Sequence, residues 1–190
     1  MGIVNVTPDS FSDAGEAFSA VRAAERALRL LEEGADVIDV GGESTRPGAD
    51  PVPVGEEIRR VVPAIREILA ERPEAVVSVD TYRSETAEAA LEAGALMVND
   101  ITALRGDPRM ARLVAEAGCG VVLMHMRGTP KTMQRDPRYE DVVGEVREFL
   151  AGRAEAAVAA GVDPGCILLD PGIGFGKTLE HNIALLGRLD

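Results

Sequence analysis

The sequence is poor in aromatic, histidine and cysteine residues, and each shortage argues against a class of site. Aromatic side chains make up 3% of the 190 residues and tryptophan is missing, which argues against base-stacking platforms for single-stranded nucleic acid. Two histidines are too few to favour a histidine-based metal site. The two cysteines, Cys119 and Cys166, each stand at the start of an apolar run, which predicts reduced thiols rather than a disulfide.

Long apolar runs and a leader segment are also missing. The longest runs, such as residues 120–124, are far shorter than the roughly 18 residues that span a bilayer. The first dozen residues carry acidic and polar side chains but no basic segment, so they do not read as a signal peptide. We expect a cytoplasmic protein that does not enter the membrane.

The charge balance is strongly acidic. Twenty basic residues face 32 acidic ones, for a formal net charge of −12. Such a surface argues against nucleic-acid binding, which requires a cationic stripe. Any phosphate site must therefore be built locally from arginine, lysine, backbone N–H groups or a metal ion.

Six short apolar runs alternate with longer amphipathic stretches along the whole chain. The runs are rich in valine, isoleucine and leucine, as expected for parallel strands buried on both faces. They cover residues 2–6, 36–40, 75–79, 95–98, 120–124 and 166–169. Helical spacing covers residues 19–34, 56–71, 84–93, 109–117 and 141–160, with Pro63 expected to kink or shorten the second helix. We predict an α/β fold in which residues 1–190 form one domain.

The strand ends favour a (β/α)8 barrel over a doubly wound sheet. Each apolar run ends near a polar residue, and a barrel mouth collects one such residue from every strand. A doubly wound sheet usually places a glycine-rich turn after its first strand, whereas the first turn here reads Thr-Pro-Asp-Ser over residues 7–10. The sequence therefore predicts a barrel of which about six βα units are present.

Asp80, Asn99 and Asp170 end the third, fourth and sixth runs. Polar groups buried at a barrel mouth are costly unless a ligand meets them, and two carboxylates with an amide suit the donor edge of a pterin or purine ring. Taken alone, each of these residues has a structural explanation that is as good as ligand binding: it could cap a helix or form a hydrogen bond between strands.

Two loops carry further candidates. Asn5 offers an amide oxygen suited to a hard cation such as Mg²⁺. Arg46 stands among glycines and hydroxyls, where it is able to grip a phosphate, although an exposed loop arginine is the plain alternative. The tract 170–178 resembles a P-loop but has Pro171 where the first glycine is required, so its glycines indicate close approach of a ligand. His125 is as readily a core residue as a catalytic one.

Several of these segments resemble the dihydropteroate synthase family in the same order. The most specific are Met-Gly-Ile-Val-Asn-Val-Thr-Pro-Asp-Ser-Phe-Ser-Asp over residues 1–13 and Gly-Gly-Glu-Ser-Thr-Arg-Pro-Gly over residues 41–48. Further matches cover residues 78–81, 99–101, 124–126, 130–134 and 170–177. The resemblance implies a TIM-barrel transferase of folate biosynthesis that joins 6-hydroxymethyl-7,8-dihydropterin pyrophosphate to p-aminobenzoate.

The resemblance also assigns roles to individual residues. Those implied to bind the pterin are Asp80, Asn99, Ile101, Met124, Asp170 and Phe175. The residues implied to bind the diphosphate are Asn5, Thr45 and Arg46, and Asn5 is also implied to hold Mg²⁺. Those implied to form the p-aminobenzoate site are Thr7, Pro8, Asp9, Ser10, Phe11, Arg46 and Pro47.

The chain departs from the family in length. A family barrel has eight strands, whereas six runs are found and the sequence stops early in the sixth helix. We therefore expect a barrel domain cut at both ends, without strands seven and eight and without their lysine, arginine and histidine ligands. Two alternatives stay open: a pterin-dependent methyltransferase relative, and a non-catalytic pterin-binding protein that ends at Asp190. The family usually dimerises, which implies a homodimer of the full-length protein.

Overall fold

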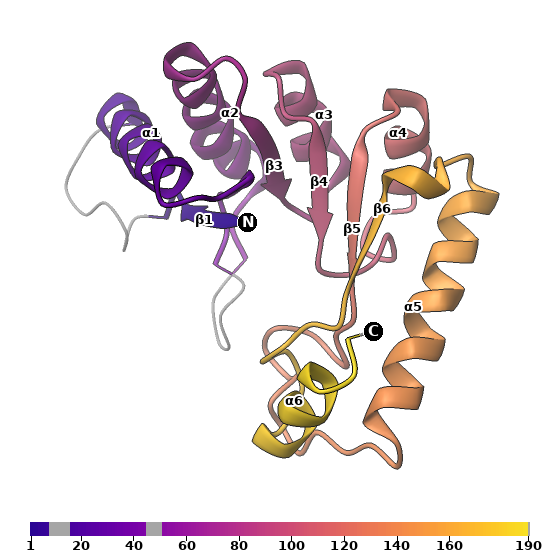
Figure 1. The fold of residues 1–190 in the computed structure, drawn as a ribbon. Coiled ribbons are helices and arrows are strands. Elements are labelled where there is room, and N and C mark those ends of the chain that lie inside the picture. The colour runs from indigo at the N-terminus through magenta and orange to yellow at the C-terminus, as the bar shows by residue number, and fades with distance from the viewer. Residues whose placement is uncertain (8–15, 45–50, 190) are drawn as a thin grey trace. The chain divides into compact units, whose positions relative to one another are not determined.

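The computed structural model describes residues 1–7, 16–44 and 51–189, with the side chains of residues 16–19 left out (Figure 1). Seven residues with predicted roles therefore lie outside the described residues: Pro8, Asp9, Ser10, Phe11, Thr45, Arg46 and Pro47. The described chain falls into two compact units, one formed by residues 1–44 and 51–99 and the other containing the described residues from Asp100 onward.

The first unit holds four strands and three helices in strict alternation. Their order is β1 (Gly2–Asn5), α1 (Glu16–Glu32), β2 (Val37–Gly41), α2 (Val54–Glu71), β3 (Val76–Asp80), α3 (Ser84–Glu92) and β4 (Met97–Asp100, whose last residue belongs to the second unit). The strands pair in parallel, each with its neighbour in sequence, in the order β1-β2-β3-β4. A doubly wound sheet reverses its order at a switch point, whereas consecutive order is that of a barrel.

The two faces of this sheet differ in character. Val4, Val40, Val79 and Val98 occupy one transverse row and are fully buried. A Cβ atom added to Gly2, on the same face as Val4, would lie 2.9 Å from Leu30 Cβ of α1, so this face is the one that the helices cover (Figure 1). The helices meet these valines with an apolar stripe that includes Ile65 and Ile68 of α2. The opposite face carries the next residues along each strand, because successive side chains of a strand alternate. Packing thus leaves the second face for the polar residues at the strand ends.

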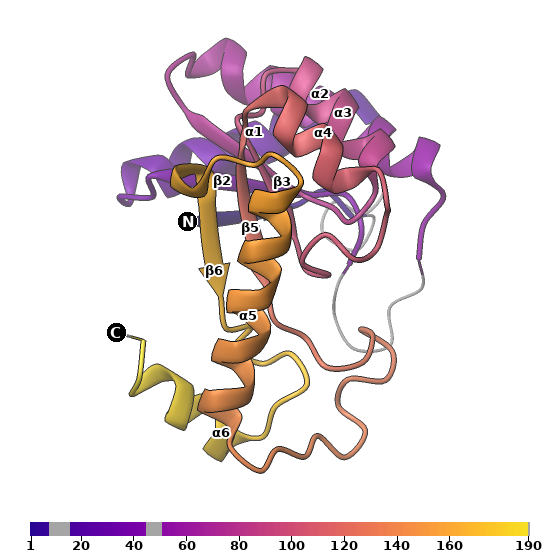
Figure 2. The same ribbon diagram turned by 90° about the vertical axis from the view of Figure 1, so that its right-hand side faces the viewer.

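The second unit contains α4 (Met110–Ala117), β5 (Gly120–Met124), α5 (Val142–Ala159), a short 3-10 turn η2 (Pro164–Cys166), β6 (Ile167–Asp170) and α6 (Leu179–Leu186). Strands β5 and β6 are parallel, with Val121 opposite Ile167 and Met124 opposite Asp170. Helix α5 runs beside both strands (Figure 2) and packs Val146 and Leu150 against Leu185 of α6. The unit therefore repeats the strand–helix pattern of the first.

Two details differ from expectation. Pro63 lies inside α2 without ending it, and the helix begins at Val54, two residues before the predicted start. Burial of Val61, Ala64 and Ile65 around this position stabilises the helix and compensates for the missing N–H group. Both cysteines are free thiols, but Cys166 is half-buried rather than part of the core. No helix in the described ranges combines the length and apolar content needed to cross a lipid bilayer.

We predict that Ile65→Ala lowers the free energy of unfolding by about 2–5 kcal/mol, because Ile65 is fully buried and its truncation leaves a cavity. The exposed Glu67 on the same helix provides the control, and Glu67→Ala is expected to change stability by less than about 0.5 kcal/mol. Denaturant titration of both variants measures the difference; equal losses would contradict the assignment of Ile65 to the core.

Candidate functional site

A row of polar side chains crosses the carboxyl-terminal edge of the first unit. Asn5 pairs in register with Gly41, Gly41 with Asp80, and Asp80 with Asn99. Parallel strands in this register present these residues on the same face of the sheet. A Cβ atom added to Gly41 would lie 3.3 Å from Asn5 Oδ1 and 3.5 Å from Asp80 Oδ2, so the two oxygens flank the space that glycine leaves open.

A second polar layer lies one row deeper on the same face. Asp39 and Ser78 are register partners two residues before Gly41 and Asp80, and Asp39 is only 3% exposed. Asn99 Nδ2 donates a hydrogen bond to Asp39 Oδ2 over 2.9 Å. Burial raises the pKa of Asp39, and the hydrogen bond from Asn99 opposes that rise. The deeper layer therefore fixes the orientation of the Asn99 amide.

Three buried oxygens of this cluster have no hydrogen-bond partner among the described residues: Asp39 Oδ1, Ser78 Oγ and Asn99 Oδ1. Buried polar atoms are nearly always hydrogen-bonded, so these three oxygens are candidates for contact with a bound ligand or water. Asp39 is one of the polar residues near the ends of the apolar runs, but no binding role was predicted for it. The available signal was an acidic residue inside an apolar run, at a position that the alternation of the strand places on the polar face.

The second unit has its own group of candidate site residues at the ends of β5 and β6. Met124 is buried opposite Asp170, and His125 N donates to the Asp170 carbonyl over 2.9 Å. Asp170 Oδ1 accepts from Gly172 N over 2.7 Å, which ties the carboxylate to the loop that follows β6. Gly172 has φ +67°, and a Cβ there would lie 2.1 Å from the His125 carbonyl oxygen. Only glycine fits this close approach.

The remaining predicted residues divide as follows. Asp80, Asn99 and Asp170 stand at or next to the ends of β3, β4 and β6, as predicted, and all three are half-buried. In the second unit Ile101 follows β4 and is buried, and Phe175 is half-buried in the loop after β6. Thr7 is half-buried just beyond β1. Each unit thus gathers its own predicted residues at the carboxyl ends of its strands.

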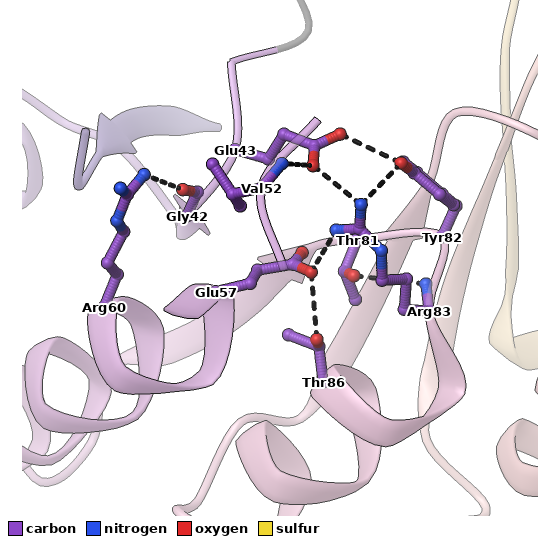
Figure 3. A network of polar contacts seen from close by, with 9 residues as sticks. All are labelled: Gly42, Glu43, Val52, Glu57, Arg60, Thr81, Tyr82, Arg83 and Thr86. Atoms are coloured by element: carbon purple, nitrogen blue, oxygen red, sulfur yellow. Dashed lines mark hydrogen bonds and ion pairs between the residues drawn. The ribbon is translucent and has the colours of Figure 1, made fainter. Parts of the chain in front are cut away.

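A buried ionic network stabilises the same edge of the first unit (Figure 3). Arg83 at the start of α3 donates to Glu57 Oε2 over 2.5 Å and to Glu43 Oε2 over 2.8 Å. Glu57 is only 1% exposed and also accepts from Thr86 Oγ1 over 3.0 Å. Burial acts to lower the pKa of Arg83, but its hydrogen bonds to the two carboxylates raise it above the usual value. The Arg83 guanidinium therefore supplies the positive charge that pairs with the buried Glu57 carboxylate.

Glu43 connects that network to the loop after β2. Its Oε1 accepts from Tyr82 Oη over 3.0 Å, and its Oε2 accepts from Val52 N over 2.8 Å. Burial, followed by the hydrogen bond to Glu43, raises the pKa of Tyr82 to about 12, so its hydroxyl stays a donor at neutral pH. One carboxylate thus holds chain positions on both sides of residues 45–50. Sequence analysis noted Glu43 but missed Tyr82 and Arg83, which stand about 40 residues away.

The donor set at Asn5 suits a hard cation. In the described part of the chain no group of three histidine, cysteine, aspartate or glutamate residues is placed to hold a metal ion. Asn5 Oδ1 nevertheless faces the open position at Gly41, and Mg²⁺ is often held by one or two protein oxygens together with substrate phosphates. The Asn5 amide oxygen therefore fits a metal that arrives with a phosphorylated ligand.

Comparisons with known proteins agree with this geometry. The family model described as "Pterin binding enzyme" matches residues 1–190. The chain is 48% identical over 189 residues to dihydropteroate synthase of Escherichia coli K12, and 49% identical over 193 residues to that of Neisseria meningitidis serogroup B. It is covered completely in both alignments but spans 66% and 67% of the two relatives. The chain thus corresponds to about two thirds of the length of these two relatives.

Solved structures that are similar to this chain are also dihydropteroate synthases. A dihydropteroate synthase of Xanthomonas albilineans with 4-aminobenzoic acid superposes with a TM-score of 0.90 at 51% identity, covering 100% of this chain and 66% of that one. The same enzyme in complex with 7,8-dihydropteroate superposes with a TM-score of 0.85 at 48% identity, again with 100% and 66% coverage.

We predict that Arg83→Met lowers the free energy of unfolding by about 3–5 kcal/mol, because it leaves the carboxylate of Glu57 buried without its cation. Replacing both partners, as in Arg83→Met with Glu57→Met, is expected to recover most of that loss. The control is Arg59→Met, which breaks an exposed pair with Glu56 and is expected to cost about 1 kcal/mol or less. Similar losses at Arg83 and Arg59 in urea titrations would refute the network's role.

Proposed function

Because this chain belongs to the dihydropteroate synthase family of pterin-binding enzymes, we propose that its protein condenses 6-hydroxymethyl-7,8-dihydropterin pyrophosphate with p-aminobenzoate, releasing 7,8-dihydropteroate and pyrophosphate. The fold class is accordingly the (β/α)8 barrel, with six of its βα units present in this chain. The observation that carries the proposal is the placement of Asp80, Asn99 and Asp170 at the ends of their strands, in a chain that matches the family over its whole length.

The pterin is proposed to bind through both carboxylates and the amide. Asp80 and Asp170 accept from the ring's amino and N–H groups, and Asn99 contributes an amide whose orientation Asp39 sets. Ile101, Met124 and Phe175 supply apolar surface for the flat ring. Small-molecule sites typically combine apolar walls that hold the ligand with a few polar groups that fix its orientation.

The diphosphate is proposed to lie near Asn5, Thr45 and Arg46. Asn5 would hold Mg²⁺, which when bound neutralises the charge of the departing pyrophosphate. Arginine is suited to bidentate contacts with phosphate oxygens, and a hydroxyl adds a further donor. The p-aminobenzoate site is proposed to be formed by Thr7 and residues 8–11 together with Arg46 and Pro47.

The reaction exchanges one bond for another at the methylene carbon attached to the pterin ring. The carbon–oxygen bond to the diphosphate breaks, the aryl amine nitrogen forms a bond to that carbon, and the amine loses a proton. Electron donation from the dihydropterin ring supports the positive charge that develops on the carbon. Asp80 and Asp170 stabilise that charge through the ring that they bind. Exclusion of water by the loops protects the cation from hydrolysis.

Partners and location follow the same reasoning. We propose small-molecule substrates only, no nucleic-acid partner and no membrane association. A cytoplasmic location and a homodimer of the complete protein also stay proposals. A pterin-dependent methyltransferase would use a similar pterin pocket, but the Thr-Pro-Asp-Ser-Phe-Ser loop over residues 7–12 favours the synthase.

The experiment that tests this function is Asp170→Asn in the complete protein. We expect pterin affinity, measured by calorimetry, to fall roughly 10- to 100-fold, because a charged hydrogen-bond acceptor is lost. The exposed Asp163 provides a matched control, and Asp163→Asn is expected to leave affinity unchanged. Unchanged affinity in Asp170→Asn would refute its role as an anchor. Pterin binding by the unaltered protein without release of pyrophosphate would identify a binder rather than a synthase.

Asn5→Ala separates the diphosphate site from the pterin site. We expect a higher KM for the pyrophosphate substrate and a higher Mg²⁺ requirement, because the amide ligand is removed. Affinity for 6-hydroxymethylpterin, which has no diphosphate, is expected to stay within about twofold, since Asn5 is not proposed to touch the ring. Equal losses with both ligands would contradict a separate metal and diphosphate role for Asn5.

A further inference from the structure

Two polar residues of the second unit have no part in the proposed reaction, yet they are buried in contact with each other. His125 directly follows β5 and Lys177 precedes α6, and their exposed fractions are 5% and 4%. Lys177 Nζ lies 3.0 Å from His125 Nδ1. Lysine is rarely buried to this extent, so the position calls for an explanation.

The acceptors around Lys177 are backbone carbonyls as well as the imidazole. Its Nζ donates to the carbonyl of Phe175 over 2.9 Å, to that of Gly172 over 3.0 Å and to that of His125 over 3.3 Å. One ammonium group thus joins both ends of a tight turn to the end of β5. This arrangement differs from a P-loop lysine, which points toward a bound phosphate, because Lys177 points into its own loop.

Side chains donate hydrogen bonds to four carbonyls of this loop, those of residues 172, 174, 175 and 176. Besides the bonds to Lys177, the Gly174 carbonyl accepts from Gln134 Nε2 over 2.6 Å and the Gly176 carbonyl accepts from Tyr139 Oη over 2.8 Å. The conformation includes positive φ at residues 172, 174 and 176. Side chains therefore supply the order that regular secondary structure does not, and the central contribution is that of Lys177.

The protonation states agree with this pattern. Burial lowers the pKa of Lys177 to about 8, although the Asp170 carboxylate acts to raise it. Burial, followed by the charge of Lys177, lowers the pKa of His125 to about 4, and Arg127 and Arg105 add to that effect. Near neutral pH the lysine is therefore an ammonium donor and the histidine a neutral acceptor at Nδ1, with its proton on Nε2. Retaining a cation where burial disfavours it is typical of functional sites.

We propose that Lys177, together with His125, is a positioning residue for the pterin site: it holds the loop over residues 171–176 so that Asp170 and Phe175 face the ring. The proposal rests on the proposed function, because both positioned residues are pterin contacts there. The link is short, since Asp170 Oδ1 accepts from Gly172 N and the carbonyl of Gly172 accepts from Lys177. Loss of the ammonium releases the Gly172 and Phe175 carbonyls together.

The test begins with Lys177→Met in the complete protein, which keeps the length of the side chain but removes its charge and donors. We expect pterin affinity to fall at least tenfold and amide hydrogen exchange over residues 171–178 to accelerate, with thermal unfolding still cooperative. Lys131→Met is the control for loss of a lysine in the same unit and is expected to change neither readout. Unchanged affinity and exchange in Lys177→Met would overturn the proposal.

His125 supplies the readouts that separate positioning from mere packing. His125→Asn retains an acceptor near Nδ1 and is expected to keep affinity within about threefold, whereas His125→Phe keeps a ring against Phe149 but lacks the acceptor and should resemble Lys177→Met. The double variant, Lys177→Met with His125→Phe, is expected to be no weaker than Lys177→Met alone, because both changes remove the same bond. Fully additive losses, or equal losses in His125→Asn and His125→Phe, would contradict the coupling.

Failure of this proposal is distinguishable from failure of the proposed function. Absence of pterin binding by the unaltered protein would refute the function, and with it the positioning role in that site. If the unaltered protein binds the pterin and Lys177→Met binds it equally well, the function stands and the positioning role fails. Faster exchange over residues 171–178 with unchanged affinity would show that Lys177 orders the loop only, and would equally overturn the proposal.

Discussion

The register between parallel strands is the constraint on which the rest of this molecule depends. Pairing Asn5 with Gly41, Gly41 with Asp80 and Asp80 with Asn99 aligns four strand ends in one row. A slip of one residue in any pair would exchange the polar face for the valine row beneath the helices. Burial of those valines therefore holds the polar row in place, so the same packing that stabilises the sheet also builds the candidate site.

Polar groups behind this row determine how its members point. Asp39 orients the Asn99 amide, while Arg83 ties Glu43 to Glu57 and so connects the loop after β2 to the starts of α2 and α3. In the second unit Lys177 serves the loop after β6 in a comparable way. The Arg83 and Lys177 clusters each use a charge whose partners compensate for its desolvation, which is costly unless the geometry is closely satisfied.

Sequence reasoning predicted the elements well and their supporting contacts poorly. The apolar runs became strands within one or two residues, and Asp80, Asn99 and Asp170 took the expected places at strand ends. The expected shortening of the helix at Pro63 was wrong, because the burial of α2 outweighs the local penalty of proline. No role was predicted for Asp39, because an acid inside an apolar run gives no indication of its partner, which stands 60 residues away.

The alternation of strands and helices, the consecutive parallel order and the identities of the strand-end residues were determined by the sequence alone. The reason is local: a strand buried on both faces must be apolar and must stop where polar residues begin. Only the tertiary structure decided that Arg83 bridges Glu43 and Glu57 and that Lys177 meets His125. These partners are separated by 40, 26 and 52 residues, so their contacts arise only when the fold of each unit brings distant segments of that unit together.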